Sequence, residues 1–228
     1  GTTGPPKAVM ITHRNVGWAI YSIGSIMHIS PEDTVISYLP LCHIAEKTCS
    51  LYGPLCFGMN VFFCAPDALR GTLVITMRQV GPTVFFGVPR IWEKIQERMI
   101  ANSGKQAVMC CYCIPTGAWG KRKWKDLVTW ALGLGLKGCY AKQQKGPMPK
   151  NWWYANEIVF QNVKVALGLQ RCRICISAAA PLSIETAEFF MALNIIIYEC
   201  FGMSETGGPV TFNAPARPGH YSAWRTNS

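Results

Sequence analysis

Residues 172–206 read CRICISAAAPLSIETAEFFMALNIIIYECFGMSET, and this stretch decides the fold class. It opens with a short apolar run, Cys172 to Ser177, which has the length of a buried strand. Residues Ser183 to Leu193 carry a helical pattern, and Ile195 to Tyr198 form a second apolar run. A strand, a helix and another strand in this order predict a crossover unit in a parallel sheet.

The N-terminal 100 residues show the same alternation of strands and helices. We expect strands at 35–39, 60–64 and 83–87, a weaker one at 7–12, and helices at 13–27, 43–56, 69–80 and 90–100. Residues 105–170 interrupt the alternation as a helical, basic, insertion-like segment with one long helix at 152–169. We predict an α/β fold with a mostly parallel sheet and flanking helices, and a loop from residue 215 on.

The bulk composition is that of a folded chain. Its 228 residues suffice for one or two domains, and 50% of them are hydrophobic while 15% are charged, which argues against disorder. No uninterrupted apolar run reaches the roughly 20 residues of a membrane-spanning helix, and no secretory leader is visible. The eleven cysteines form no array with metal-ligand spacing, so we expect reduced, mostly buried thiols in the cytoplasm.

The positive charge is concentrated in the middle of the chain. The formal net charge is +10, and residues 121–173 hold eleven Lys and Arg but only two acidic residues. Such a segment suits a solvated basic face, an anionic membrane surface or a polyanionic substrate. Nucleic acid is disfavoured as a partner because no nucleic-acid-binding motif accompanies the charge.

The first seven residues, GTTGPPK, have the composition of a phosphate-binding loop. Glycine allows backbone N–H groups to turn toward an anion, threonine hydroxyls add donors, and Lys7 adds a positive charge. The Walker A motif is excluded because Pro6 precedes Lys7 and Ala8 follows it. A solvent-exposed loop between strands is the alternative.

Two further motifs adjoin the predicted strands of the crossover unit. In SAAAPL, residues 177–182, small side chains allow a flat group to approach the backbone, although close packing explains them equally well. In FGMSETGG, residues 201–208, an aromatic ring, a hydroxyl and a carboxylate could stack on a base, bond a phosphate and hold Mg²⁺. Ligands of open α/β sheets bind beyond the carboxyl ends of the strands. His43 also follows a predicted strand, but a lone histidine is more often structural.

Together, in this order, the motifs resemble those of the adenylate-forming superfamily of acyl-CoA synthetases, luciferases and peptide-synthetase adenylation domains. GTTGPPK resembles its phosphate loop, SAAAPLS its adenine-site segment, and FGMSET its Tyr-Gly-x-Ser/Thr-Glu motif. Four other stretches resemble the bubblegum-type long-chain acyl-CoA synthetases: SYLPLCHIAEK, PDALRGTL, TVFFGVPRIWEKIQERM and TAEFFMALNI. Residues 1–228 would then be part of the AMP-binding (adenylation) domain, the large N-terminal domain of that fold.

The resemblance implies a two-step ligase reaction with ATP, Mg²⁺ and coenzyme A. A long-chain fatty acid carboxylate attacks the α-phosphate of ATP to give an acyl-adenylate and pyrophosphate, and the thiol of CoA then takes the acyl group. Catalysis in such a site rests on positioning and charge neutralisation.

The resemblance also implies a role for individual residues around the phosphates. The β- and γ-phosphates would be surrounded by Thr2, Thr3, Gly4 and Lys7. Ser204 would bond the α-phosphate, and Glu205 would hold Mg²⁺. His43 would lie near the reacting carboxylate, so that Lys7, His43, Ser204 and Glu205 form the implied catalytic set.

For the adenine, the resemblance implies contact with Phe201 and Gly202. The adenine pocket would be lined by Ala178, Ala179, Ala180 and Pro181. Ala178 stands where the family usually has glycine, so a positive φ there would cost roughly 1 kcal/mol.

The sequence leaves several points open. The ribose-binding aspartate, the hinge and the small C-terminal domain of the family would lie beyond Ser228, so we expect the isolated chain to be inactive as a ligase. Aromatic or amino acids are alternative substrates. The alternative function is a non-catalytic nucleotide-binding or membrane-surface protein, peripheral on endoplasmic reticulum or other membranes, that uses the basic stretch Lys121 to Lys150.

Overall fold

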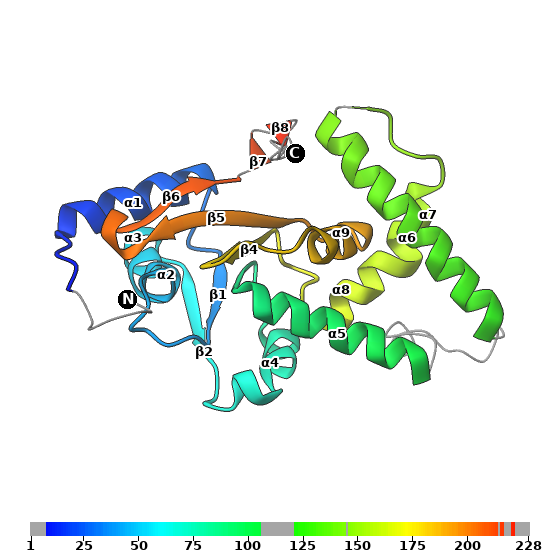
Figure 1. The fold of residues 1–228 in the computed structure, drawn as a ribbon, viewed down its shortest axis with the longest axis horizontal. Helices are drawn as coiled ribbons and strands as arrows, with labels where there is room; N and C mark the ends of the chain where they lie inside the picture. The colour runs from blue at the N-terminus through cyan, green and yellow to red at the C-terminus, as the bar shows by residue number, and fades with distance from the viewer. Residues whose placement is uncertain (1–7, 106–120, 145, 214, 217–219, 222–228) are drawn as a thin grey trace.

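The computed structural model describes residues 8–105, 121–144, 146–213, 215–216 and 220–221. Its centre is a six-stranded sheet in the order β2-β1-β3-β4-β5-β6, in which only the β5–β6 pair is antiparallel (Figure 1). The predicted mostly parallel sheet is therefore confirmed. The strands are β1 (Thr34–Ser37), β2 (Asn60–Phe63), β3 (Val84–Gly87), β4 (Ile174–Ala178), β5 (Ile197–Met203) and β6 (Gly208–Phe212).

Alternating side chains divide the sheet into two apolar faces. In the register of β3 and β4, Phe85 lies opposite Cys175 on one face, and Phe86 lies opposite Ile176 on the other. Both faces are buried, which is why these strands read as continuous apolar runs rather than as alternating patterns.

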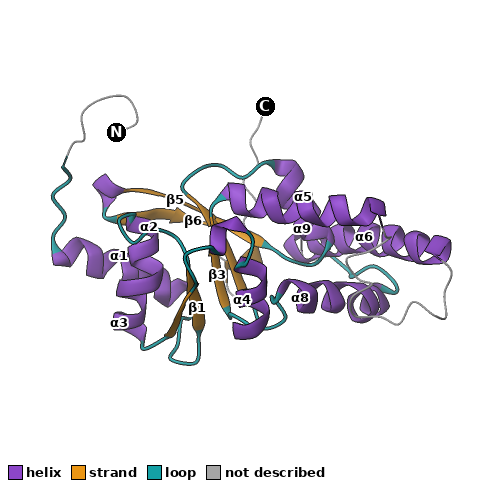
Figure 2. Cartoon of the chain, turned by 90° about the horizontal axis from the view of Figure 1, so that it is seen from below, coloured by secondary structure: helices purple, strands orange, loops and turns teal. Residues whose placement is uncertain are grey.

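Helices cover both faces, as Figure 2 shows. Phe85 faces the larger group, in which Trp92 is fully buried, meets Phe85 and Phe190 edge to face at 5.2 Å each, and donates from Nε1 to the Ile176 carbonyl at 3.3 Å. This group comprises α4 (Leu73–Val80), α5 (Pro89–Lys105), α8 (Gln161–Leu167) and α9 (Ile184–Ala192). On the opposite face lie α1 (His13–Ile26), α2 (Ile44–Lys47), the π-helical turn η1 (Thr48–Tyr52) and α3 (Gly53–Phe57).

The described part of the middle segment, residues 121–144 and 146–170, is mainly helical. Helix α6 (Lys121–Gln144) packs against α9, where a Cβ on Gly135 would lie 1.9 Å from the Ala192 carbonyl oxygen, so only glycine permits this approach. The predicted helix at 152–169 is continuous over 152–167 but consists of α7 (Trp152–Ala155), the π-helical η5 (Asn156–Phe160) and α8. Among the described residues, no helix combines the length and apolar character needed to cross a bilayer.

The predicted start of the first helix is confirmed, because its capping residues lie next to one another in the sequence. Thr12 caps α1 as predicted: its hydroxyl accepts from the Asn15 N–H at 3.2 Å, while the Asn15 side chain accepts from the Thr12 N–H at 3.1 Å. Two other predictions of local structure were wrong. Residues 8–12 form no strand, and the helix predicted at 69–80 is divided at Gly71, with φ of 143°, into η2 (Ala68–Arg70) and α4.

The C-terminal part departs most from the sequence-based expectation. Strand β5 continues through Phe201, Gly202 and Met203, which were predicted to follow it. The reason is β6, which the sequence analysis missed and which pairs with these residues, Phe201 facing Thr211. Residues 215–216 and 220–221, expected to be loop, form the short paired strands β7 (Pro215–Ala216) and β8 (His220–Tyr221).

One polar cluster ties the amino ends of the strands together. The Arg173 guanidinium, just before β4, binds both carboxylate oxygens of Asp33, just before β1, and donates to the carbonyls of Met27 at 2.8 Å and His28 at 2.9 Å. The Thr83 hydroxyl, just before β3, donates to Asp33 Oδ1 at 2.7 Å. We call Arg173, Asp33 and Thr83 the Arg173 clamp. It fixes three strand starts and the end of α1 relative to one another.

The clamp predicts a pH-dependent stability. Burial would raise the pKa of Asp33, but the hydrogen bonds from Arg173, Thr83 and Ser30 and the Arg173 charge outweigh it and lower the pKa below the ordinary 3.8. A lowered folded-state pKa adds stability that is present above the unfolded-state pKa and is lost as the pH falls through the folded-state value. We expect Asp33→Asn to lower the free energy of unfolding by about 1–3 kcal/mol at neutral pH, and by less below about pH 4.

Urea unfolding of both proteins across this pH range measures the effect. The control is Asp67→Asn, because the Asp67 side chain is exposed and makes no capping hydrogen bond. If the difference in the free energy of unfolding between the wild type and Asp33→Asn stayed constant from neutral to acid pH, the linkage would be contradicted.

Candidate functional site

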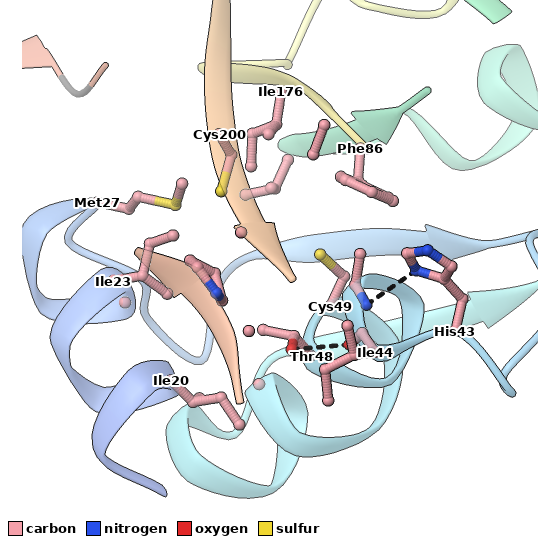
Figure 3. A pocket seen from close by; sticks show the side chains of 18 of the residues that line it. Ile20, Ile23, Met27, His43, Ile44, Thr48, Cys49, Phe86, Ile176 and Cys200 are labelled. Carbon is pink, nitrogen blue, oxygen red and sulfur yellow. Dashed lines mark hydrogen bonds between the residues drawn. The ribbon is translucent and has the colours of Figure 1, made fainter. Parts of the chain in front are cut away.

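The parallel strands bring the predicted site motifs to one edge of the sheet. His43 follows β1, Ala179 follows β4, and Ser204 and Glu205 follow β5. Because these strands run in the same direction, their carboxyl ends meet, and all four residues line one pocket together with Ala178 and Gly202 (Figure 3). The sequence-based expectation of a site beyond the strand ends therefore agrees with the geometry.

The pocket is deep and mostly apolar. Its volume is about 350 Å³, within the range of small-molecule sites. It lies between the sheet and the helices α1 to α3, and Figure 3 shows side chains from both sides pointing into it. The labelled apolar lining includes Ile20 and Ile23 of α1, Met27 just after it, Ile44 of α2, and Phe86 and Ile176 of the sheet. The polar residues His43, Ser204 and Glu205 lie where the strands end.

His43 has a structural role in addition to its place at the pocket. Its Nδ1 accepts a hydrogen bond from the Ala45 N–H at 3.2 Å and so caps the N-terminus of α2. Since Nδ1 is the acceptor, a neutral His43 carries its proton on Nε2 and can donate from that atom. Capping therefore orients the ring rather than excluding a function for it.

A buried carboxylate, which the sequence analysis missed, supports this wall of the pocket. Glu46 is 1% exposed, and its Oε1 accepts from the hydroxyls of Ser37 at 2.9 Å and Ser50 at 2.7 Å. It thereby ties the end of β1 to η1, which presents Thr48 and Cys49 to the pocket. A charged residue within an apolar helical pattern was the available signal.

The two thiols in the pocket are poor nucleophiles at neutral pH. Burial, followed by the Glu46 and Cys200 charges, raises the pKa of Cys49 well above its ordinary value. Burial raises the pKa of Cys200 to about 11. Both side chains are therefore protonated, and they act as small apolar groups that line the cavity.

The loop after β4 is held in an unusual conformation. Ala179 has φ of 77°, whereas Ala178 lies in the strand and has no positive φ, so the backbone cost expected at Ala178 falls on its neighbour. The loop is fixed from β5, where Glu199 Oε1 accepts from the Leu182 N–H at 2.9 Å. A non-glycine residue in the left-handed region costs about 1–2 kcal/mol and is often found at functional sites.

The turn after β5 displays Ser204 and Glu205 toward solvent. It is the 3₁₀ turn η6 (Ser204–Thr206), in which the Thr206 hydroxyl accepts from the Met203 N–H at 3.3 Å. A Cβ on Gly202 would lie 2.4 Å from the Gly208 carbonyl oxygen, so packing between β5 and β6 alone requires glycine there. Among the described residues, no three His, Cys, Asp or Glu side chains cluster as a metal site. A single exposed carboxylate still suits Mg²⁺, which commonly binds one or two carboxylates plus substrate phosphates.

The remaining predicted site residues are placed differently or not described. Phe201 is 58% exposed and, like the exposed Ala180 and Pro181, does not line the pocket. The predicted phosphate-loop residues lie outside the described part of the chain: Thr2, Thr3, Gly4 and Lys7.

Comparison with known proteins decides the family. The family model described as AMP-binding enzyme matches residues 1–225 of this chain. The chain belongs to the AMP-binding enzyme family. Members related to it include the long-chain-fatty-acid–CoA ligase ACSBG2 of Xenopus laevis, which is 42% identical over 94% of this chain, and ACSBG1 of Bos taurus, 34% identical over 98%. The bubblegum-type resemblance inferred from the sequence is thereby confirmed.

The extent and the fold of the family match are also clear. This AMP-binding chain spans 28% of the Xenopus laevis protein and 29% of the Bos taurus protein. Its fold is shared with o-succinylbenzoate CoA synthetase (MenE) of Bacillus subtilis in complex with its acyl-adenylate intermediate, at a TM-score of 0.57 and 16% identity. That alignment covers 94% of this chain and 30% of the other.

The conformation of Ala179 yields a stability prediction. Glycine adopts positive φ without the steric cost of a Cβ, so we expect Ala179→Gly to raise the free energy of unfolding by about 0.5–1 kcal/mol. Ala180→Gly is the matched control, because Ala180 is exposed and has no positive φ. Urea unfolding measures both changes. Equal effects of the two substitutions would show that the left-handed backbone carries no strain.

Proposed function

We propose that this chain supplies nucleotide-binding and acyl-binding residues of an AMP-forming long-chain fatty acid–CoA ligase. The observation that supports this most directly is that one pocket contains both an apolar region and a polar region. An apolar cavity opens among His43, Ser204 and Glu205 at the strand ends. Such a site fits a ligand with a long apolar part and an anionic head.

The acyl-adenylate of a fatty acid is such a ligand. In the proposed arrangement Ser204 would donate to the α-phosphate and Glu205 would hold Mg²⁺. Lys7 and the loop before it would contact the β- and γ-phosphates of ATP. The magnesium ion, when bound, neutralises charge on the phosphate oxygens. His43, with Nε2 as its donor, hydrogen bonds the acid carboxylate and holds it for attack on phosphorus. CoA is the proposed acceptor of the acyl group.

The lining favours an aliphatic acid over the alternatives. Glu205 is the only formally charged residue among the described lining residues, and it stands at the strand ends rather than in the apolar part. The ammonium group of an amino acid would therefore be desolvated without a partner, which is unfavourable. The relatives named as long-chain-fatty-acid–CoA ligases support the same choice.

Protection of the pocket thiols tests the proposal by binding rather than turnover, since the chain spans 28% of a related ligase. We expect a non-hydrolysable palmitoyl-adenylate analogue, at about ten times its dissociation constant, to slow alkylation of Cys49 and Cys200 by roughly tenfold. Alkylation is followed by mass spectrometry near pH 9, where more thiolate forms.

Two controls are internal to this experiment. The exposed Cys56 does not line the pocket, so its alkylation rate should not change. An acetyl-adenylate analogue, which lacks the long chain, should leave the deep thiols reactive. Equal protection by both analogues would contradict an acyl chain in the cavity, and no protection by either would contradict the proposed function.

A second candidate function, peripheral membrane contact, is favoured by an exposed aromatic face. Trp153 and Tyr154 of α7 are 62% and 56% exposed, and their rings meet edge to face at 5.1 Å. Ile158 and Val165 are exposed farther along the same continuous helix, and Lys150 is exposed just before it. Trp and Tyr beside Lys are typical of residues at a membrane–water interface.

The basic stretch contributes less to this face than its composition suggests. Lys142 donates to Asn194 Oδ1 at 3.2 Å and lies 4.4 Å from the centre of the Trp152 ring, Lys164 is half-buried, and Arg173 belongs to the clamp. These three charges serve the fold. The side chains of Lys121, Arg122, Lys123 and Lys125 lie outside the described part.

Vesicle cosedimentation tests the membrane contact. We expect Trp153→Ala/Tyr154→Ala to weaken partitioning onto phosphatidylserine-containing vesicles by roughly tenfold, because two interfacial aromatic side chains are removed. Trp18→Ala is the matched control, since Trp18 is 73% exposed but lies on α1, across the sheet from α8. Unchanged partitioning of the double variant, or an equal loss with Trp18→Ala, would contradict the assignment of this face.

A further inference from the structure

A pair of thiols lies at the start of β4, away from the pocket. Cys172 and Cys175 flank the clamp residue Arg173 in the sequence, and their Sγ atoms are 3.5 Å apart. Cys172 is half-exposed on the turn before the strand, whereas Cys175 is buried on the face toward the larger helix group. One thiol is thus accessible, and a second lies within contact distance of it.

The surroundings provide a positive charge for these thiols. Lys164 of α8 is half-buried, and its charge interacts favourably with the thiolate form of Cys175. The hydrogen bond with Cys172, followed by burial, raises the pKa of Cys175, so the buried thiol is the weaker initial nucleophile. The accessible Cys172 is therefore placed to react first, with Cys175 behind it. This order is that of an attacking and a resolving cysteine.

We propose that Cys172 and Cys175 form a redox-active dithiol that a low-molecular-weight disulfide of the glutathione type oxidises to an intramolecular disulfide. The spacing Cys-x-x-Cys is that of known dithiol sites. The two sulfur atoms must approach from 3.5 Å to about 2 Å for the bond to form.

The chemistry balances with glutathione disulfide as the oxidant. The Cys172 thiolate attacks one sulfur of glutathione disulfide, which forms a mixed disulfide and releases one glutathione thiolate. The Cys175 thiol loses its proton and attacks Cys172 Sγ, which releases the second glutathione. The two protein thiols lose two protons and two electrons in total, and the oxidant becomes two glutathione thiols.

Oxidation of this pair acts on the Arg173 clamp. Arg173 lies between the cysteines, and its guanidinium holds Asp33 and the carbonyls of Met27 and His28. Closure of the disulfide moves the backbone that carries Arg173, so the clamp opposes oxidation. By linkage, weakening the clamp makes oxidation easier by the same factor by which oxidation weakens the clamp.

Peptide mapping of the full chain after equilibration with glutathione disulfide tests the dithiol. Trypsin cleaves after Arg171 and Arg173, so Cys172 stays attached to the Cys175 peptide only through a disulfide. A second cleavage after Glu185 separates Cys175 from Cys200. We expect the linked peptide in the wild type and in Cys56→Ala, and a loss of about tenfold or more in Cys172→Ala. Cys172 is half-exposed and Cys175 is buried, so Cys172→Ala tests the pair with less change to the core than Cys175→Ala would cause.

The opposite results are equally clear. A Cys172 that carries only glutathione, or that stays reduced while the exposed Cys42 and Cys56 become glutathionylated, would overturn the dithiol. For the clamp, we expect Asp33→Asn to reach half-oxidation at a severalfold lower ratio of glutathione disulfide to glutathione than Asp67→Asn does. Equal ratios in these two folded variants would overturn the coupling. Neither readout depends on ligase activity.

Discussion

The bidentate contact between Arg173 and Asp33 is the interaction on which the rest of the fold depends. It joins residues 140 positions apart in the chain and fixes the amino ends of β1 and β4, with Thr83 adding β3. Strands that start at fixed points and run parallel also end at fixed points. The positions of His43 after β1 and Ala179 after β4 follow from this, although neither touches the clamp. Ser204 follows β5, which is placed by its pairing with β4. The Asp33 carboxylate is buried, so it depends on the Arg173 charge and on its hydrogen-bond donors for its stability there.

The pocket depends on a different feature, which is the difference in helix packing between the two faces of the sheet. On one face, side chains pack closely around the fully buried Trp92, and the contact between α6 and α9 requires glycine at position 135. On the other face, helices α1 to α3 stand away from the strands and leave a cavity of about 350 Å³. Glu46 stabilises that separation by bonding to both sides of it. The same sheet thereby provides a rigid core and a ligand site.

Strand β4 links these features. Its N-terminal end carries Arg173 between two cysteines, and its C-terminal end carries the left-handed Ala179. The strand is fully buried and pairs with β3 and β5 on either side. Every residue of the strand therefore packs against neighbours rather than facing solvent. The strand is five residues long, so the thiol pair and the pocket are parts of one short structural unit.

The sequence by itself determined the α/β class, most element positions, the cap at Thr12 and the motifs at the strand ends, because period, capping and strand-end chemistry are local properties. It missed β6 and the extension of β5, since a short edge strand gains its stability from its partner and not from its own pattern. It also placed the backbone cost at Ala178, whereas the positive φ lies at Ala179, in the loop that Glu199 contacts. The Arg173 clamp, the buried Glu46 and the approach of Cys172 to Cys175 were decided only by tertiary structure, because each depends on side-chain geometry that a linear pattern does not encode.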